Sequence, residues 1–118
     1  MVGRRQAGWS GRERTREYDK RVGLSDDVAR VRFVTVDRKV IAYTVQYEPW
    51  VAGAYRPAAR YASAHGQPHL DLLDWDGKVV EKRWLASTSL NEALEDALAA
   101  LDRDWPIWRE AFLRRRPR

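Results

Sequence analysis

Three residues with side chains suited to acid–base chemistry lie close together in the chain: Arg60, His69 and Asp71. If two antiparallel strands meet at a turn over 65–68, period-two geometry places all three side chains on one face. We expect them to form a solvent-accessible cluster. A histidine beside a carboxylate can transfer protons, and an arginine can bind a phosphate. These residue types therefore fit cleavage of a phosphodiester, with His69 as the acid or base.

The same residues also fit roles without chemistry. Arg60 and Asp71 can form a cross-strand ion pair, and His69 can cap the turn, which are structural or recognition roles. A further alternative is a metal site made of His65, His69 and Asp71. The chain has no cysteine, which excludes a disulfide framework, a thiolate metal site and a cysteine nucleophile. We expect no cofactor.

Positive charge is concentrated at the two ends of the chain. Residues 1–23 carry seven lysines and arginines against three carboxylates, residues 114–118 carry four arginines, and residues 24–113 carry 11 cations against 14 carboxylates. Basic ends are typical of arms that contact phosphates, and also of solvated tails that aid solubility. We predict a flexible basic arm over 1–23 with room for a short helix over 12–21, one domain over 24–113, and a basic tail over 114–118.

Hydrophobic alternation predicts the strands. Residues 29–48 form a hairpin with a three-residue turn at 37–39, which places Ile41 on an apolar face with Phe33 and Tyr43. Further strands are predicted near 58–64, 69–74 and 78–85, the last two joined by a three-residue turn at 75–77. In that register Leu70, Leu72 and Trp84 share the core face, and His69, Asp71, Glu81 and Arg83 share the other.

One long helix ends the chain. Ser89 and Glu92 have the spacing of a capping box, and an apolar stripe at helical spacing follows from Leu90 to Phe112. Pro106 lacks the N–H that would continue the helical ladder, so we expect a kink or break there. The order of elements predicts an α+β fold, in which an antiparallel sheet of about five strands packs on this C-terminal helix.

The segment Arg60-Tyr61-x-x-Ala64-His65-Gly66-x-x-His69-x-Asp71, followed by Asp76-Gly77, resembles a family of small uncharacterised prokaryotic proteins. The likeness continues through Asn91-Glu92-Ala93, Trp105 and Phe112, and it covers roughly residues 30–113. The Arg-Tyr and His elements look more loosely like TumE-type toxins of toxin–antitoxin pairs. Ala62 stands where the family pattern has Asp, which weakens a catalytic role that depends on that carboxylate.

We predict a small binding or regulatory domain that engages nucleic acid, such as RNA, or a protein partner through its open sheet face and basic tails. The alternatives are a metal-independent ribonuclease of toxin type and a structural homodimer. The sequence has no apolar run long enough for a membrane span and no secretory signal, so we expect a cytoplasmic location. The candidate binding residues are Arg30, Arg32, Arg60, Arg83, Trp75, Arg114, Arg115 and Arg116.

Overall fold

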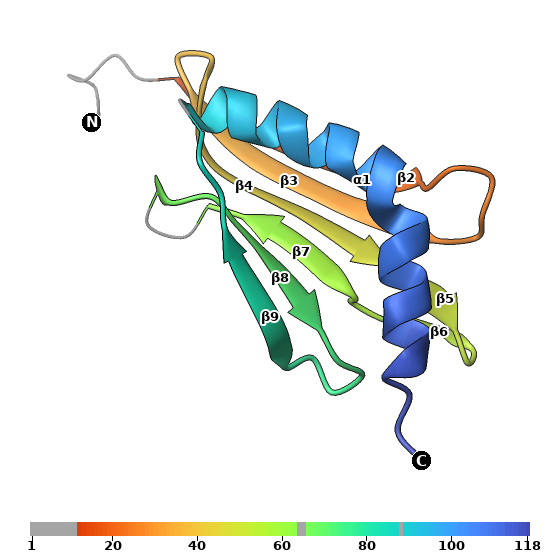
Figure 1. The fold of residues 1–118 in the computed structure, drawn as a ribbon. Coiled ribbons are helices and arrows are strands. Elements are labelled where there is room, and N and C mark those ends of the chain that lie inside the picture. Colours follow the sequence, from red (N-terminus) through yellow and green to blue (C-terminus); the bar gives the residue numbers. More distant parts are fainter. Residues whose placement is uncertain (1–11, 64–65, 88) are drawn as a thin grey trace.

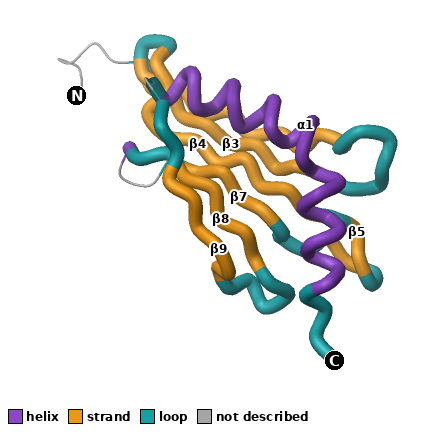
Figure 2. Tube along the Cα trace, in the orientation of Figure 1, coloured by secondary structure: helices purple, strands orange, loops and turns teal. Residues whose placement is uncertain are grey.

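The computed structural model describes residues 12–63, 66–87 and 89–118. These residues form one six-stranded antiparallel sheet with a helix across one face (Figures 1 and 2), so the predicted α+β class is confirmed, with six strands rather than five. In sheet order the strands are β2 (Glu13–Arg21), β3 (Val28–Val36), β4 (Lys39–Glu48), β7 (Ala59–Ala62), β8 (His69–Leu73) and β9 (Val79–Trp84). A separate small hairpin consists of β5 (Trp50–Val51) and β6 (Ala54–Tyr55), and the helix is α1 (Leu90–Arg114).

The sixth strand, β2, lies in the segment that we expected to be a flexible arm. It pairs with β3 over nine residues. Its sequence has no apolar period because its side chains are mostly exposed. Ion pairs join it to β3 instead, with Glu17 Oε1 2.9 Å from Arg32 Nε and Asp19 Oδ2 2.7 Å from Arg30 Nη1. The prediction of a flexible arm or a short helix is therefore wrong for Glu13–Arg21. Residues 1–11 of that arm lie outside the described residues.

The β3–β4 hairpin has the predicted body but not the predicted turn. Phe33 lies opposite Tyr43, as expected. The turn has two residues, Asp37 and Arg38, both with positive φ, and a bulge next to it leaves Ile41 without a cross-strand partner. The extra residue gives the body the register that a three-residue turn would have given. Ile41, expected on the core face, is exposed.

The β8–β9 hairpin has the predicted turn but not the predicted pairing beyond it. Its turn is as predicted, and Leu73 lies opposite Val79. A bulge after this pair adds Val80 to β9, and a one-residue shift moves every later side chain of the strand to the other face. Trp84, predicted to lie under the helix, is 60% exposed on the face away from α1. Arg83 lies on the helix side instead.

Helix α1 begins as predicted, because the Ser89 hydroxyl accepts a hydrogen bond from the Glu92 N–H at 3.1 Å. Pro106 lies inside the helix without ending it, and the helix bends so that its second half approaches β5 and β6 (Figure 1). No helix in the described part of the chain is long and apolar enough to span a membrane. The buried helix residues are Ala93, Leu94, Ala97, Ala100, Leu101, Trp108 and Phe112.

The core lies between α1 and the sheet. Rings from two strands, Tyr47 and Tyr61, pack against Trp108 with centroids 6.0 and 5.8 Å from that ring. Among the described residues, no helix covers the opposite face of the sheet (Figure 2). We call it the open face, and Arg60, His69 and Asp71 lie on it.

Candidate functional site

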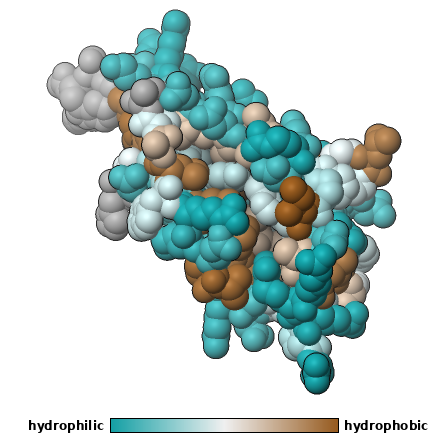
Figure 3. All heavy atoms as spheres, in the orientation of Figure 1, coloured by the Kyte–Doolittle hydropathy of each residue, from teal (hydrophilic) through white to brown (hydrophobic). Residues whose placement is uncertain are grey.

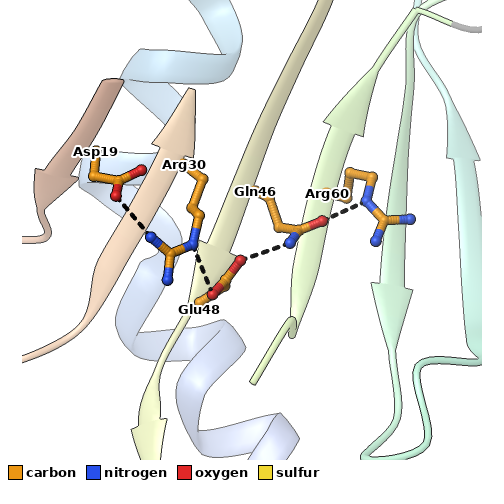
Figure 4. Close-up of polar contacts among 5 residues, drawn as sticks. All are labelled: Asp19, Arg30, Gln46, Glu48 and Arg60. Atoms are coloured by element: carbon orange, nitrogen blue, oxygen red, sulfur yellow. Dashed lines mark hydrogen bonds and ion pairs between the residues drawn. The ribbon is translucent and has the colours of Figure 1, made fainter. Parts of the chain in front are cut away.

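A line of polar contacts crosses the open face from β2 to β7 (Figure 4). Arg30 donates from Nη1 to Asp19 at 2.7 Å and from Nε to Glu48 at 3.0 Å. Gln46 donates from Nε2 to Glu48 at 2.7 Å, and its Oε1 accepts a hydrogen bond from the Nε of Arg60 at 2.6 Å. Four adjacent strands contribute to this line. Residues two apart on a strand share a face, so Gln46 and Glu48 of β4 both belong to it.

These contacts neutralise the positive charges predicted to bind a partner. The hydrogen bond and the charge of Glu48 raise the pKa of Arg30. Arg32 is paired with Glu17, with Nε to Oε1 at 2.9 Å. Both arginines therefore already have carboxylate partners, and phosphate binding by either would break an existing ion pair.

The Arg60, His69 and Asp71 side chains share the open face, as period-two geometry predicted. Arg60 lies opposite Asp71 and Ala62 opposite His69, two residues away from the predicted pairing, and an even shift preserves the faces. The expected accessibility is wrong for two of the three residues. His69 is 4% exposed and Asp71 is 6% exposed.

Strand β9 covers this pair. His69 has Nε2 3.5 Å from Oδ2 of Asp71 and Nδ1 3.2 Å from the backbone oxygen of Gln67. The Lys82 ammonium lies 2.8 Å from Oδ1 of Asp71, in an ion pair rather than an aligned hydrogen bond. The ring of Trp84 lies 5.3 Å from that of His69 and beneath the Lys82 ammonium. A substrate could reach the imidazole only by displacing these β9 side chains, so the geometry fits strand pairing better than catalysis.

Trp75, predicted to be available for a partner, packs against the end of α1. Its indole Nε1 donates to the backbone oxygen of Phe112 at 2.9 Å, and the two rings are stacked with centroids 5.1 Å apart. The guanidinium groups of Arg56 and Arg116 lie over the indole at 4.9 and 5.4 Å. Trp75 therefore has a packing role that its position at a hairpin tip did not indicate.

The other basic candidates near the C-terminus also have partners. Arg114 belongs to the last turn of α1 and pairs with Glu110. Arg115 donates from Nη2 to the backbone oxygen of Leu73 at 3.0 Å. Arg83, farther back in the chain, pairs with Glu81, and both lie on the helix side of the sheet and not on the open face as predicted. The predicted basic tail therefore begins inside the helix, and part of it is attached to the domain.

The sequence did not indicate a role for Asp27, a buried carboxylate on the helix side of the sheet. Asp27 accepts from the Tyr47 hydroxyl at 2.6 Å and from the backbone N–H of Trp50 at 2.9 Å. The Nε of Arg109 on α1 lies 3.2 Å from the same carboxylate. Burial, followed by the bond to Asp27, raises the pKa of Tyr47. Asp27 thus joins the helix to β4 and β5.

A cationic cavity lies where β2 begins and the β3–β4 turn ends. Its volume is about 500 Å³, and we call it the arginine cavity. The backbone holds it in place, because Asp37 donates its N–H to the Arg12 oxygen at 3.2 Å and its carboxylate accepts from the Arg12 N–H at 3.1 Å. Asp37 is the one carboxylate among its lining residues. Those residues are Arg12, Arg14, Thr35, Asp37 and Arg38.

The arginine cavity depends on two features that the sequence did not reveal. The backbone of Arg14 is held in place by the pairing of β2 with β3 opposite Thr35. The backbone of Arg38 is held by the positive-φ turn. The clustering of arginines in residues 1–23 was the available signal. For metal binding, the described residues contain no group of three or more acidic, histidine or cysteine side chains able to hold an ion, and His65 lies outside them.

Comparisons with known proteins add a family. A domain of unknown function, DUF7718, matches residues 12–118, which include β2 as well as the predicted domain. No curated protein and no solved structure matches the chain. The match does not extend to TumE-type toxins, so that resemblance stays a prediction. Because this match includes all of the described residues, the chain belongs to the DUF7718 family.

Proposed function

We propose that the protein is a nucleic-acid-binding domain that holds backbone phosphates in the arginine cavity. The observation that carries the proposal is the convergence of three arginines, Arg12, Arg14 and Arg38, on one concave site with a single carboxylate. Arginine binds phosphate oxygens through several N–H donors at once. Contacts of this kind supply the sequence-independent part of nucleic-acid affinity.

The pattern of ion pairs supports this location over the open face. Within the described residues, no carboxylate lies within 4.0 Å of the Arg14 or Arg38 guanidinium, whereas Arg30 and Arg32 each have one within 3.0 Å. A phosphate that enters the arginine cavity meets the guanidinium groups of Arg14 and Arg38, which have no carboxylate partner among the described residues, whereas one that binds the open face must compete with Asp19, Glu17 or Glu48. The binding role predicted for the open face is thus transferred to the end of the sheet.

The test compares a double arginine variant in the arginine cavity with a single arginine variant on the open face. Binding of a fluorescent single-stranded RNA, and of a duplex of the same length, is measured by anisotropy over a range of salt concentrations. Loss of two phosphate contacts in Arg14→Ala/Arg38→Ala should weaken binding and reduce the slope of log K against log salt by about 1 to 2. The control Arg32→Ala removes an arginine that is already paired, and it should bind nearly as the parent protein does.

Two results would overturn the proposal. One is that the parent protein binds neither oligonucleotide at low salt. The other is that Arg32→Ala loses half or more of the binding free energy that the double variant loses, which is the result expected if net charge alone decides binding, because it removes one charge and the double variant removes two. If the RNA is cut during the assay, and cutting is lost in folded His69→Ala, the ribonuclease hypothesis replaces simple binding. The shared face of Arg60, His69 and Asp71 is the observation that keeps that alternative in the experiment.

A further inference from the structure

Strand β9 is an edge of the sheet whose outer backbone groups have no strand partner among the described residues. The direction of these groups follows from one hydrogen bond, in which the Leu85 N–H donates to the Pro68 oxygen at 3.0 Å, toward β8. In an antiparallel ladder, residues facing inward and outward alternate. The backbone groups of Glu81 and Arg83 therefore face β8, and those of Lys82 and Trp84 face outward.

The two edges of the sheet differ in their side chains. β2, the other edge, is dominated by charged residues, and such residues discourage a further strand from adding. On β9, Val79 is 47% exposed, Val80 49% and Trp84 60%. Figure 3 shows a hydrophobic patch over the part of the surface where β9 lies in Figure 1. An edge with exposed apolar side chains and free backbone groups is suited to pair with another strand.

We propose that the partner is a second copy of this chain, with β9 paired antiparallel to β9 around a two-fold axis at Lys82. The outward-facing residues of the two copies then exchange backbone hydrogen bonds. Lys82 lies opposite Lys82 of the second copy, and Glu81 lies opposite Arg83. The two sheets become one sheet of twelve strands with both helices on the same side, since a two-fold axis perpendicular to the sheet preserves its faces.

Charge complementarity selects this register over its neighbours. Glu81 and Arg83 already form an ion pair within each copy, and with the axis at Lys82 the Glu81 of each copy also lies opposite Arg83 of the other, so that opposite charges alternate across the two strands. A shift of the pairing by two residues in one direction places Glu81 opposite Glu81, and in the other direction it places Arg83 opposite Arg83. Both alternatives put like charges directly against each other and are destabilised.

The charge of Lys82 agrees with the same register. The two Lys82 side chains meet near the axis, but each has its ammonium 2.8 Å from Asp71 and over the ring of Trp84. Their charges are therefore balanced within each copy.

The test uses charge variants that fail alone and succeed together. The parent protein should have twice the mass of its 13.8 kDa chain in sedimentation or native mass spectrometry. Glu81→Arg and Arg83→Glu should each be monomers, because each places like charges across the axis. A mixture of the two restores both opposite-charge pairs and should form a one-to-one heterodimer. Glu13→Arg, the same change on the β2 edge, is the control and should stay dimeric.

Several outcomes would overturn this proposal. It fails if the parent protein is monomeric over the whole concentration series, or if either single variant stays dimeric. It also fails if the mixture of folded variants, checked by circular dichroism, forms no heterodimer. Loss of the dimer in Glu13→Arg would place the interface on the other edge. None of these measurements involves nucleic acid, so the outcome is independent of the arginine cavity.

Discussion

The two faces of the sheet use the same types of residue under opposite conditions. On the helix side, Asp27 is 2% exposed and accepts from Tyr47, the Trp50 backbone and Arg109. On the open face, Glu17 and Arg32 form an ion pair in which both side chains are more than half exposed. The first carboxylate joins three elements of the fold, and the second joins two neighbouring strands that already share a hydrogen-bonded ladder.

The comparison shows which charges stabilise the fold. A buried carboxylate that loses its role leaves its partners without an acceptor and without water, which is costly. An exposed pair is solvated in the unfolded and the folded chain, so its net contribution is small. Charge on the open face sets what the surface can bind, whereas charge at Asp27 sets whether α1 stays docked.

The largest effect should come from Asp27→Ala. It leaves the Tyr47 hydroxyl, the Trp50 N–H and the Arg109 guanidinium without their acceptor, and we expect the free energy of unfolding to fall by about 3–5 kcal/mol. Urea denaturation measures the change. The neighbouring Asp26, whose side chain is 84% exposed, gives the matched control, and Asp26→Ala should cost less than about 1 kcal/mol. Equal losses in the two variants would contradict the distinction between buried and exposed carboxylates.

A second effect should appear only at high pH, on the helix side. Burial, followed by the charges of Tyr61 and Asp96, raises the pKa of Tyr43 to about 12. In the unfolded chain tyrosine ionises near pH 10, so the folded state loses stability as pH rises from about 10 to 12 and keeps it below that window. Denaturation midpoints across this range should fall. Tyr43→Phe should reduce the fall, and since the Tyr43 hydroxyl has no partner in the described residues, it should not destabilise the protein at pH 7.

The smallest effect should come from the exposed pair of the open face. Glu17→Gln removes the partner of Arg32 and should change the free energy of unfolding by less than about 1 kcal/mol, because both side chains remain solvated. The same urea experiment measures it, with and without 1 M salt, which screens the parent pair. A loss comparable to that of Asp27→Ala would mean that the two faces do not differ as described.

The two hairpins explain how far the fold could be predicted. For β3–β4 we used burial to choose the register, and burial gave the correct body because one face is apolar from Ala29 to Phe33. For β8–β9 the turn sequence predicts the register. The turn is as predicted, but the pairing of β9 beyond the bulge is shifted by one residue. Each hairpin contains a bulge of one residue, and a bulge has no signature in the turn sequence. After the bulge, β9 consists mostly of charged residues. It therefore has no apolar face from which the register could be predicted.

The candidate site was predictable to the same extent. Arg60, His69 and Asp71 share a face because β7 and β8 contain no bulge, and alternation alone was enough. Their burial was not predictable, since it depends on Trp84 and Lys82 reaching the open face after the β9 bulge. The arginine cavity was missed because β2 is fixed by pairing with β3 and not by an apolar period of its own.

The order of strands in the sheet has a consequence for synthesis of the protein. Because the sheet order β2-β3-β4-β7-β8-β9 follows the chain, each strand pairs with the strand of this sheet that precedes it in the chain, with the small β5–β6 hairpin between β4 and β7. The exception is α1, which is made last and covers Tyr43, Val45 and Tyr61. On the ribosome the sheet can therefore assemble hairpin by hairpin, but its apolar face stays open to chaperones or to other chains until the final helix has emerged.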